Sequence, residues 1–237
     1  TEDYSKFLKM RTRPAQDLLD RIPAIFNPKL IYDLGCGPGN STIILQERWP
    51  DAKIIGIDAS AEMLDSAQTT YPDIEFRQES IEDFSVTKKP DCLFANASLH
   101  WLKNHDKLIP RLFDMLNTGG ILAIQIPNNF HSATHQVIIR LLHSNKAWHP
   151  LSDHLIYGSL EHPMFSAEVY YSLFNSLNAS SVQIWETTYF QEMSDYQGIL
   201  DWVKGTVLRP ILSNMDPENG LKFSNAYLEA VSKEYPT

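Results

Sequence analysis

The chain has 237 residues, 43% of them hydrophobic and 21% charged, which is enough apolar material for a substantial core. Its net charge of −9 disfavours a nucleic-acid surface, because binding phosphates requires clustered Lys and Arg. The apolar stretches are too short to span a membrane, and no signal peptide is visible. The two cysteines, Cys36 and Cys92, lie in segments typical of buried structure. We therefore expect a cytoplasmic protein, monomeric rather than oligomeric, that acts on a small molecule.

The first half of the chain alternates between strand and helix patterns. A helix whose apolar face runs from Leu18 to Phe26, with Pro14 in its first turn, precedes a strand over residues 30–34. Further strands are predicted over residues 53–58, 74–77, 91–96 and 121–126. The helices between them are predicted over residues 42–49, 60–67 and 108–116, with Asn40 or Ser41 capping the first. This alternation, with strands that are apolar almost throughout, indicates an α/β fold with a parallel sheet covered on both faces.

The pattern changes after residue 128. Helices are predicted over residues 132–143 and 167–177, followed by a long strand over 181–190. The remainder, 195–235, reads as helical, with breaks near Arg209-Pro210 and Asp216-Pro217. We therefore expect an α/β core over residues 1–190, including the N-terminal helix, and a helical cap or lid over residues 191–237.

A glycine-rich loop, Asp33-Leu34-Gly35-Cys36-Gly37-Pro38-Gly39, follows the first strand. Its glycines permit positive-φ turns and close approach of a ligand to the backbone. A dinucleotide site would need its third glycine at Asn40, whereas here it is Gly39, and Asp33 stands two residues before the first glycine. This spacing favours S-adenosylmethionine, with Asp33 near the cationic methionine end, directly or through water. Asp58, which ends the next strand, can accept both ribose hydroxyls.

Several longer segments carry a more specific resemblance. Residues 33–42, 56–60, 94–102 and 185–189, with Asp201-Trp202-Val203 and Leu208-Arg209-Pro210, closely resemble the trans-aconitate methyltransferases, a family of class I S-adenosylmethionine-dependent methyltransferases. The resemblance runs from about Tyr4 to Tyr235 and implies a Rossmann-like fold, with a mostly parallel sheet, helices on both faces and a helical cap. Family members usually continue past Pro236 into a further strand, so we expect the final strand to be missing here.

The resemblance also implies a cofactor-binding set. The three loop glycines would pass under the methionine part, and Asn96 would lie beside it at the end of its strand. Ala59 and Met63 would border the adenine, and Ser80 and Ile81 would meet its edge. The family often has an aspartate in the place of Ser80, and whether Glu79 or Glu82 replaces that contact stays open. The complete set is Asp33, Gly35, Gly37, Gly39, Asp58, Ala59, Met63, Ser80, Ile81 and Asn96.

The reaction implied by the resemblance is methyl transfer from S-adenosylmethionine to a carboxylate of trans-aconitate, giving a monomethyl ester. A carboxylate is already ionised at neutral pH, so we expect no general base and no catalytic acid–base residue. Arg209 is the first candidate for substrate binding, because a guanidinium binds a carboxylate bidentately. Arg13 is the second, since the N-terminal segment in this family can fold over the site. Trp101, Tyr189 and Trp202 could line the pocket, although each could instead be a core aromatic.

Other interpretations stay open at this point. The acceptor could be another small carboxylic acid or a carrier-bound malonyl ester, or the protein could bind S-adenosylmethionine without catalysis. A nicotinamide-dependent reductase is disfavoured by the position of Gly39. His131 and His135 have a helical i, i+4 spacing that can bind zinc, but no acidic or thiol partner stands nearby and we expect no metal. Cys36 has no evident activating base, which disfavours it as a nucleophile.

Overall fold

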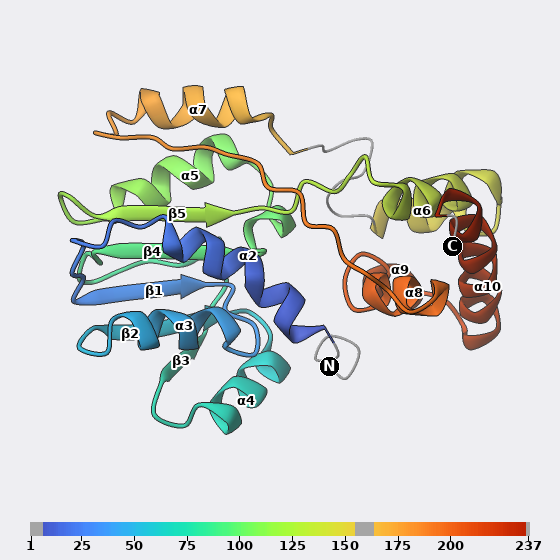
Figure 1. The fold of residues 1–237 in the computed structure, drawn as a ribbon, viewed down its shortest axis with the longest axis horizontal. Coiled ribbons are helices and arrows are strands. Elements are labelled where there is room, and N and C mark those ends of the chain that lie inside the picture. Colours follow the sequence, from blue (N-terminus) through green and yellow to red (C-terminus); the bar gives the residue numbers. More distant parts are fainter. Residues whose placement is uncertain (1–6, 155–163, 236–237) are drawn as a thin grey trace. The chain divides into compact units, whose positions relative to one another are not determined.

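The computed structural model describes residues 7–154 and 164–235 (Figure 1). The chain forms two compact units. The sheet unit consists of Leu8–Pro127 and Phe165–Trp185, and the helical unit consists of Thr1–Phe7, Asn128–Met164 and Glu186–Thr237. The expected domain boundary at residue 190 stays a prediction.

The sheet unit contains five parallel strands in the order β3-β2-β1-β4-β5 (Figure 1). Their bounds are β1 Leu30–Leu34, β2 Lys53–Asp58, β3 Glu75–Gln78, β4 Cys92–Asn96 and β5 Ile121–Gln125. The chain moves outward from β1 to β3, then returns to the other side of β1 with β4. The strand order therefore reverses between β1 and β4, and the predicted parallel sheet is confirmed.

Helices cover both faces of this sheet. The bounds are α2 Leu8–Asp20, α3 Asn40–Arg48, α4 Ala61–Thr70, η1 Leu99–Trp101, α5 His105–Asp114 and α7 Ala167–Ser176. Alternation along β1 separates two cores, because Ile31 packs with apolar residues of α2 and α3, whereas Leu30 and Tyr32 pack with α5. A strand buried on both faces explains why β1 is apolar nearly throughout.

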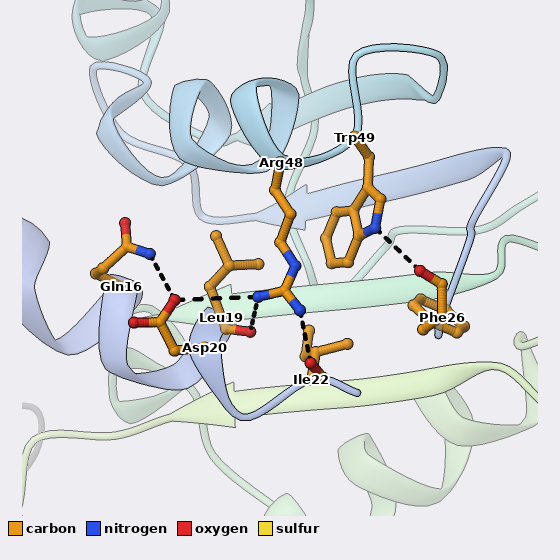
Figure 2. Close-up of polar contacts among 7 residues, drawn as sticks. All are labelled: Gln16, Leu19, Asp20, Ile22, Phe26, Arg48 and Trp49. Atoms are coloured by element: carbon orange, nitrogen blue, oxygen red, sulfur yellow. Dashed lines mark hydrogen bonds and ion pairs between the residues drawn. The ribbon is translucent and has the colours of Figure 1, made fainter. Parts of the chain in front are cut away.

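Arg48, at the end of α3, holds the C-terminal end of α2 (Figure 2). Its guanidinium donates to the carbonyl of Leu19 at 2.7 Å and to that of Ile22 at 2.6 Å. The indole N–H of Trp49 donates to the carbonyl of Phe26 at 3.1 Å. These contacts fix the end of α2 and the segment that follows it to α3, and each of the two charge-assisted bonds from Arg48 stabilises by about 1.5–3 kcal/mol.

Two predicted helix starts are wrong. Helix α2 begins at Leu8, so Pro14 lies inside the helix rather than in its first turn. A proline there costs about 3 kcal/mol, and burial of Leu18 and Leu19 offsets this, since each fully buried leucine contributes about 1.5–3 kcal/mol. Helix α3 has Gly39 as its N-cap, with φ 92° and no side-chain cap, in place of Asn40 or Ser41.

The predicted strand over residues 181–190 is also wrong, because the structure assigns no strand to these described residues. Their half-buried positions are Val182, Trp185 and Tyr189, which do not follow the two-residue period of a strand, and Phe190 is 93% exposed. A strand also requires a neighbouring strand to pair with, and the structure assigns none to these residues.

The helical unit contains α6 Ala133–Ser144, η2 His149–His154, α8 Tyr196–Lys204, α9 Arg209–Leu212 and α10 Pro217–Glu234. One core joins these elements, and its fully buried members include Val137, Leu200, Phe223 and Tyr227. Asp195 caps α8 by accepting from the Gly198 N–H at 2.8 Å, and Asp216 caps α10 in the same way. In the described part of the chain, no helix combines the length and apolar character needed to cross a membrane.

Candidate functional site

The carboxyl ends of the strands carry the predicted cofactor residues. Strands β1 and β4 are neighbours, with Asp33 paired in register with Phe94, and the strand order reverses between them. Open α/β sheets bind ligands in the crevice outside the carboxyl ends of their strands, at such a reversal. The glycine loop follows β1, Asp58 ends β2, and Asn96 ends β4, so these groups lie along one edge of the sheet.

The glycine loop is shaped by positive-φ backbone. Gly35, Gly37 and Gly39 have φ values of 72°, 54° and 92°. A Cβ atom on Gly37 would meet no atom of the described chain within 4 Å, so the backbone there borders open space. A ligand can therefore approach the loop backbone closely at Gly37.

Asp58 fixes the loop to the end of β2. Its Oδ2 accepts from the Gly37 N–H at 2.8 Å, and its Oδ1 accepts from the Ser60 N–H at 2.8 Å. A carboxylate offers about four lone-pair sites, so each oxygen can still accept a second donor. The carboxylate is held by two backbone donors and keeps capacity for a pair of adjacent hydroxyls, as a ribose would present.

Asp33 is fully buried and only half satisfied. Its Oδ2 accepts from the hydroxyls of Ser41 and Thr42, both at 2.7 Å, while its Oδ1 has no hydrogen-bond partner among the described residues. Burial raises the pKa of Asp33 to about 6; the two hydroxyl hydrogen bonds oppose the rise, and the charge of Asp58 adds to it. A buried acceptor of this kind favours a cationic or N–H ligand, which fits the amino group of S-adenosylmethionine.

Asn96 provides a second unsatisfied acceptor at the same edge. Its Oδ1 is buried and, within residues 7–154 and 164–235, accepts no hydrogen bond. Buried side-chain acceptors are rarely left without a donor unless a ligand or water supplies one. The acceptor oxygens of Asp33, Asp58 and Asn96 therefore fit a ligand that carries both a cationic amine and hydroxyls.

The predicted adenine-side residues come from the ends of β2 and β3. Ala59 follows β2, and its carbonyl accepts from Gln78 Nε2 at 3.1 Å. Met63 lies in the first turn of α4 and donates its N–H to the Ser60 hydroxyl at 3.3 Å. The hydroxyl of Ser80 accepts from the Glu82 N–H at 3.1 Å, within the turn that carries Ile81. All ten predicted cofactor residues thus belong to the sheet unit, and their individual roles stay predictions.

The predicted substrate residues are divided between the two units. Arg13 in α2 and Trp101 in η1 belong to the sheet unit, and Trp101 is 40% exposed. The helical unit contains three others, and among these the Trp202 ring packs edge-on against Phe7 with centroids 5.3 Å apart. These three residues are Arg209, an exposed residue that opens α9, Tyr189, which is half-buried, and Trp202 in α8. Their contribution to substrate binding stays a prediction.

Three residues that the sequence patterns do not identify brace the site. Ser98 donates its hydroxyl to the carbonyl of Leu34 at 2.6 Å, immediately before the glycine loop. Arg111 donates to the carbonyls of Ile81 and Phe84 at 2.5 and 2.6 Å. His105 holds the turn after β4 through the carbonyl of Leu99 at 2.9 Å. All three act on backbone carbonyls, which every residue type presents, so only three-dimensional proximity reveals them.

The histidine and cysteine alternatives gain no support. His131 precedes the N-cap of α6, so it does not share a helix with His135 as its spacing predicts. Burial lowers the pKa of His135 to about 4. Across residues 7–154 and 164–235, no group of three or more His, Cys, Asp or Glu side chains could hold a metal ion. The pKa of the Cys36 thiol is raised, mainly by burial and also by Asp33 and Asp58, which disfavours the nucleophilic thiolate.

Known proteins resemble the chain along nearly its full length. Residues 31–120 match the family model described as a methyltransferase domain. A trans-aconitate 2-methyltransferase of Methylobacterium radiotolerans is 40% identical over 98% of this chain and 88% of its own. A relative of the same name from Escherichia coli K12 is 39% identical, with the same coverage.

A solved chain from a complex between a Haloferax volcanii methyltransferase and its activator Trm112 covers 74% of this chain and 71% of its own. It has a TM-score of 0.55 and 17% identity, so the likeness concerns the fold alone.

Proposed function

Because this chain belongs to the trans-aconitate 2-methyltransferase family, we propose that it transfers a methyl group from S-adenosylmethionine to a carboxylate of trans-aconitate. The products are a monomethyl ester and S-adenosylhomocysteine. The observation that carries the proposal is the identity of about 40% to relatives of that name, over nearly the whole chain. The buried, half-satisfied Asp33 and the doubly anchored Asp58 support the cofactor.

The proposed reaction requires no general acid or base from the protein. The methyl carbon exchanges its bond to sulfur for a bond to a carboxylate oxygen, and the electron pair of the broken bond stays on sulfur. A carboxylate has an ordinary pKa of about 4, so its oxygen is already deprotonated at neutral pH. The rate then depends on alignment of the two groups and on exclusion of water.

The residues of the sheet unit supply the binding half of this mechanism. Gly37 lets the cofactor lie against the loop backbone, and Asp58 accepts its ribose hydroxyls. The free oxygen of Asp33 accepts from its amino group, directly or through water, and Asn96 lies beside its methionine part. The buried oxygens Asp33 Oδ1 and Asn96 Oδ1 thereby gain the donor that each otherwise lacks.

Cations must hold the other carboxylates of a tricarboxylic acid. We assign this role first to Arg209 and second to Arg13, since both side chains are exposed and a guanidinium binds a carboxylate through two parallel hydrogen bonds. Arg209→Ala should raise KM for trans-aconitate and leave the Kd of S-adenosylmethionine unchanged. Arg140→Ala is a matched control, because Arg140 is an exposed arginine of the same unit whose partner is Glu234.

The test is incubation with S-adenosylmethionine and trans-aconitate, followed by mass spectrometry of the acid. The expected product carries one added methyl group, formed faster than any product from cis-aconitate, citrate or isocitrate. Preferential methylation of another acid, or of a carrier-bound malonyl ester, would replace the proposed acceptor. Cofactor binding without methylation of any acid would indicate a silent binding protein. Asp58→Ala should weaken cofactor binding directly.

We also propose that the enzyme works in the cytoplasm as a monomer. Cys36 and Cys92 are free and buried, which suits a reducing compartment. Light scattering coupled to size-exclusion chromatography tests the monomer, and cell fractionation tests the location. A dimer mass, or recovery outside the cytoplasmic fraction, contradicts the respective statement.

A further inference from the structure

The segment between β4 and α5 is held in a conformation that its sequence alone disfavours. It begins at Ala97 and ends at Asn104, with φ values of 49° and 57°. Left-handed backbone at a residue other than glycine costs about 1–2 kcal/mol, most at a residue such as Ala97, which lacks a polar side chain. Such a conformation persists only where the surrounding contacts impose it.

Contacts with the sheet impose the first part of this conformation. The Ala97 N–H donates to the carbonyl of Gln125 in β5 at 3.1 Å. The Ser98 hydroxyl donates to the carbonyl of Leu34 at the end of β1, and the Leu99 side chain is fully buried. The start of the segment is therefore fixed to the strands on both sides of β4.

In the second part, the Trp101 N–H donates to the carbonyl of Ser98 at 3.1 Å, and the carbonyl of Leu99 accepts two donors. The carbonyl oxygen of Leu99 accepts from the Leu102 N–H at 2.9 Å, which closes the η1 turn, and from His105 Nε2 at 2.9 Å. Because a carbonyl can only accept, Nε2 must carry a hydrogen. The two donors fill both lone pairs of this oxygen.

His105 is itself held from a distant part of the chain. The residue is 4% exposed, and its Nδ1 lies 2.7 Å from the hydroxyl of Tyr170 in α7, 65 residues downstream. The Phe165 ring packs edge-on against it, with centroids 6.2 Å apart. The hydroxyl of Tyr170 and the carbonyl of Leu99 together fix the orientation of the imidazole ring.

We propose that His105 is a positioning residue for methyl transfer, which holds the 97–102 segment through the Leu99 carbonyl, with Tyr170 orienting its ring. The inference rests on the proposed function, because the segment connects Asn96, beside the cofactor, to the exposed Trp101. His105 acts through this backbone rather than on the reacting groups.

Loss of the His105 contact should affect the alignment of the reacting groups rather than the affinity for the cofactor. Asn96 is still in register with Gln125 on β5, so the sheet holds it whether or not His105 is present. Residues 99–102 have no such ladder. Their turn keeps the Trp101 and Leu102 backbone hydrogen bonds when His105 is replaced, but loses the side chain that connects the Leu99 carbonyl to α5, so we expect a small displacement. Misplacement by about 1 Å can cost up to about a hundredfold in rate, so kcat should fall while the cofactor Kd is retained.

The test compares variants that keep different nitrogen positions. His105→Leu removes both hydrogen bonds, His105→Gln places an amide N–H near Nε2 and keeps the Leu99 contact, and His105→Asn keeps only the position near Nδ1. We expect kcat with trans-aconitate to fall about tenfold or more in His105→Leu and His105→Asn, and to stay within about threefold of wild type in His105→Gln. The Kd of S-adenosylmethionine, from calorimetry, should change less than about twofold, since the sheet still holds Asn96. His135→Leu is the control, a half-buried histidine of the other unit.

Equal kcat in wild type and His105→Asn would overturn the inference. So would equal losses of kcat in the Gln and Asn variants, whether or not the cofactor Kd is retained, since the Leu99 contact then makes no difference to the rate. The Gln and Asn pair decides the question even if His105→Leu does not fold. A wild-type enzyme that leaves trans-aconitate unmethylated contradicts the proposed function instead. In that case hydrogen exchange at the Leu102 amide decides, because faster exchange in His105→Asn supports the inference and unchanged exchange overturns it.

Discussion

The Cβ atom of Ser98 occupies the space that a side chain on Gly35 would need, because a Cβ built on Gly35 would lie 2.2 Å from it. Gly35 also has φ 72°. Gly35→Ala therefore combines a clash with backbone strain, and we expect the free energy of unfolding to fall by about 2–5 kcal/mol. Urea denaturation measures the change. Gly119→Ala is the control, with φ 80° and no described atom within 4 Å of the new Cβ, and it should cost only the strain, about 1–2 kcal/mol. Equal costs at the two positions would contradict the close contact.

A substitution at Gly37 should weaken ligand binding more than it weakens the fold. Its φ of 54° makes alanine strained, but the new Cβ would project into open space. Gly37→Ala should therefore destabilise the fold by about the same 1–2 kcal/mol as Gly119→Ala. The methyl group would occupy the space proposed for the cofactor, so the Kd of S-adenosylmethionine should rise about tenfold or more, as calorimetry can show. An unchanged Kd would mean that the cofactor lies elsewhere.

The buried carboxyl of Asp33 predicts a pH-dependent stability. Its pKa is about 6 in the folded protein, raised chiefly by burial from an ordinary value of 3.8. Between these pH values the folded state binds more protons than the unfolded state, so stability falls as pH rises from about 4 to about 6. The full difference corresponds to about 3 kcal/mol.

Asp33→Asn removes this titration. Relative to the variant, the wild type should lose up to about 3 kcal/mol of unfolding free energy between pH 4 and pH 6, with little further change above pH 6. Parallel urea titrations at several pH values measure the difference, and the other carboxylates cancel in the comparison. Since a cationic ligand favours the ionised form, the wild-type affinity for S-adenosylmethionine should also rise across this window. Parallel pH profiles for the two proteins would exclude Asp33 as the cause.

Arg111 should control the loop assigned to the adenine edge. Its guanidinium bridges the carbonyls of Ile81 and Phe84, and a lysine ammonium cannot reproduce this planar fork. Arg111→Met should lower the unfolding free energy by about 2–4 kcal/mol and weaken cofactor binding, with Arg111→Lys intermediate. Arg77→Met is the control, because Arg77 is an exposed arginine that pairs with Glu75 on its own strand. A retained cofactor Kd in folded Arg111→Met would separate Ile81 from the adenine site.

The sequence predicts the sheet well because its signals are local. The five strands and the helices between them follow from apolar runs and turn residues, and Ser60 caps α4 by accepting from Met63. The predictions that fail concern residues whose conformation depends on a partner that is not their neighbour in the sequence. The hydroxyl of Ser41 binds Asp33 rather than capping α3. Residues 181–190 are predicted as a strand from the sequence, but among the described residues no strand pairs with them.

The residues of the candidate site likewise fall into those that the sequence identifies and those that it does not. The glycine loop and Asp58 are identifiable because a ligand requires those residue types at those places. By contrast, His105 and Arg111 act on carbonyls located 6 to 30 residues away in sequence, and a carbonyl carries no signature of residue type. The hydroxyl of Tyr170 reaches His105 from 65 residues downstream, which no local pattern encodes.

The sheet unit draws its last segment, Phe165–Trp185, from beyond residues 128–164, which belong to the helical unit. During synthesis the five strands therefore emerge first, and the contacts of Tyr170 with His105 and of Trp185 with Arg21 form only after 37 intervening residues have left the ribosome. The two units cannot mature one after the other, and a nascent chain that stops within residues 128–164 holds an open sheet unit. Ribosome-bound intermediates of this protein should accordingly become resistant to protease late, once residue 185 has left the ribosome.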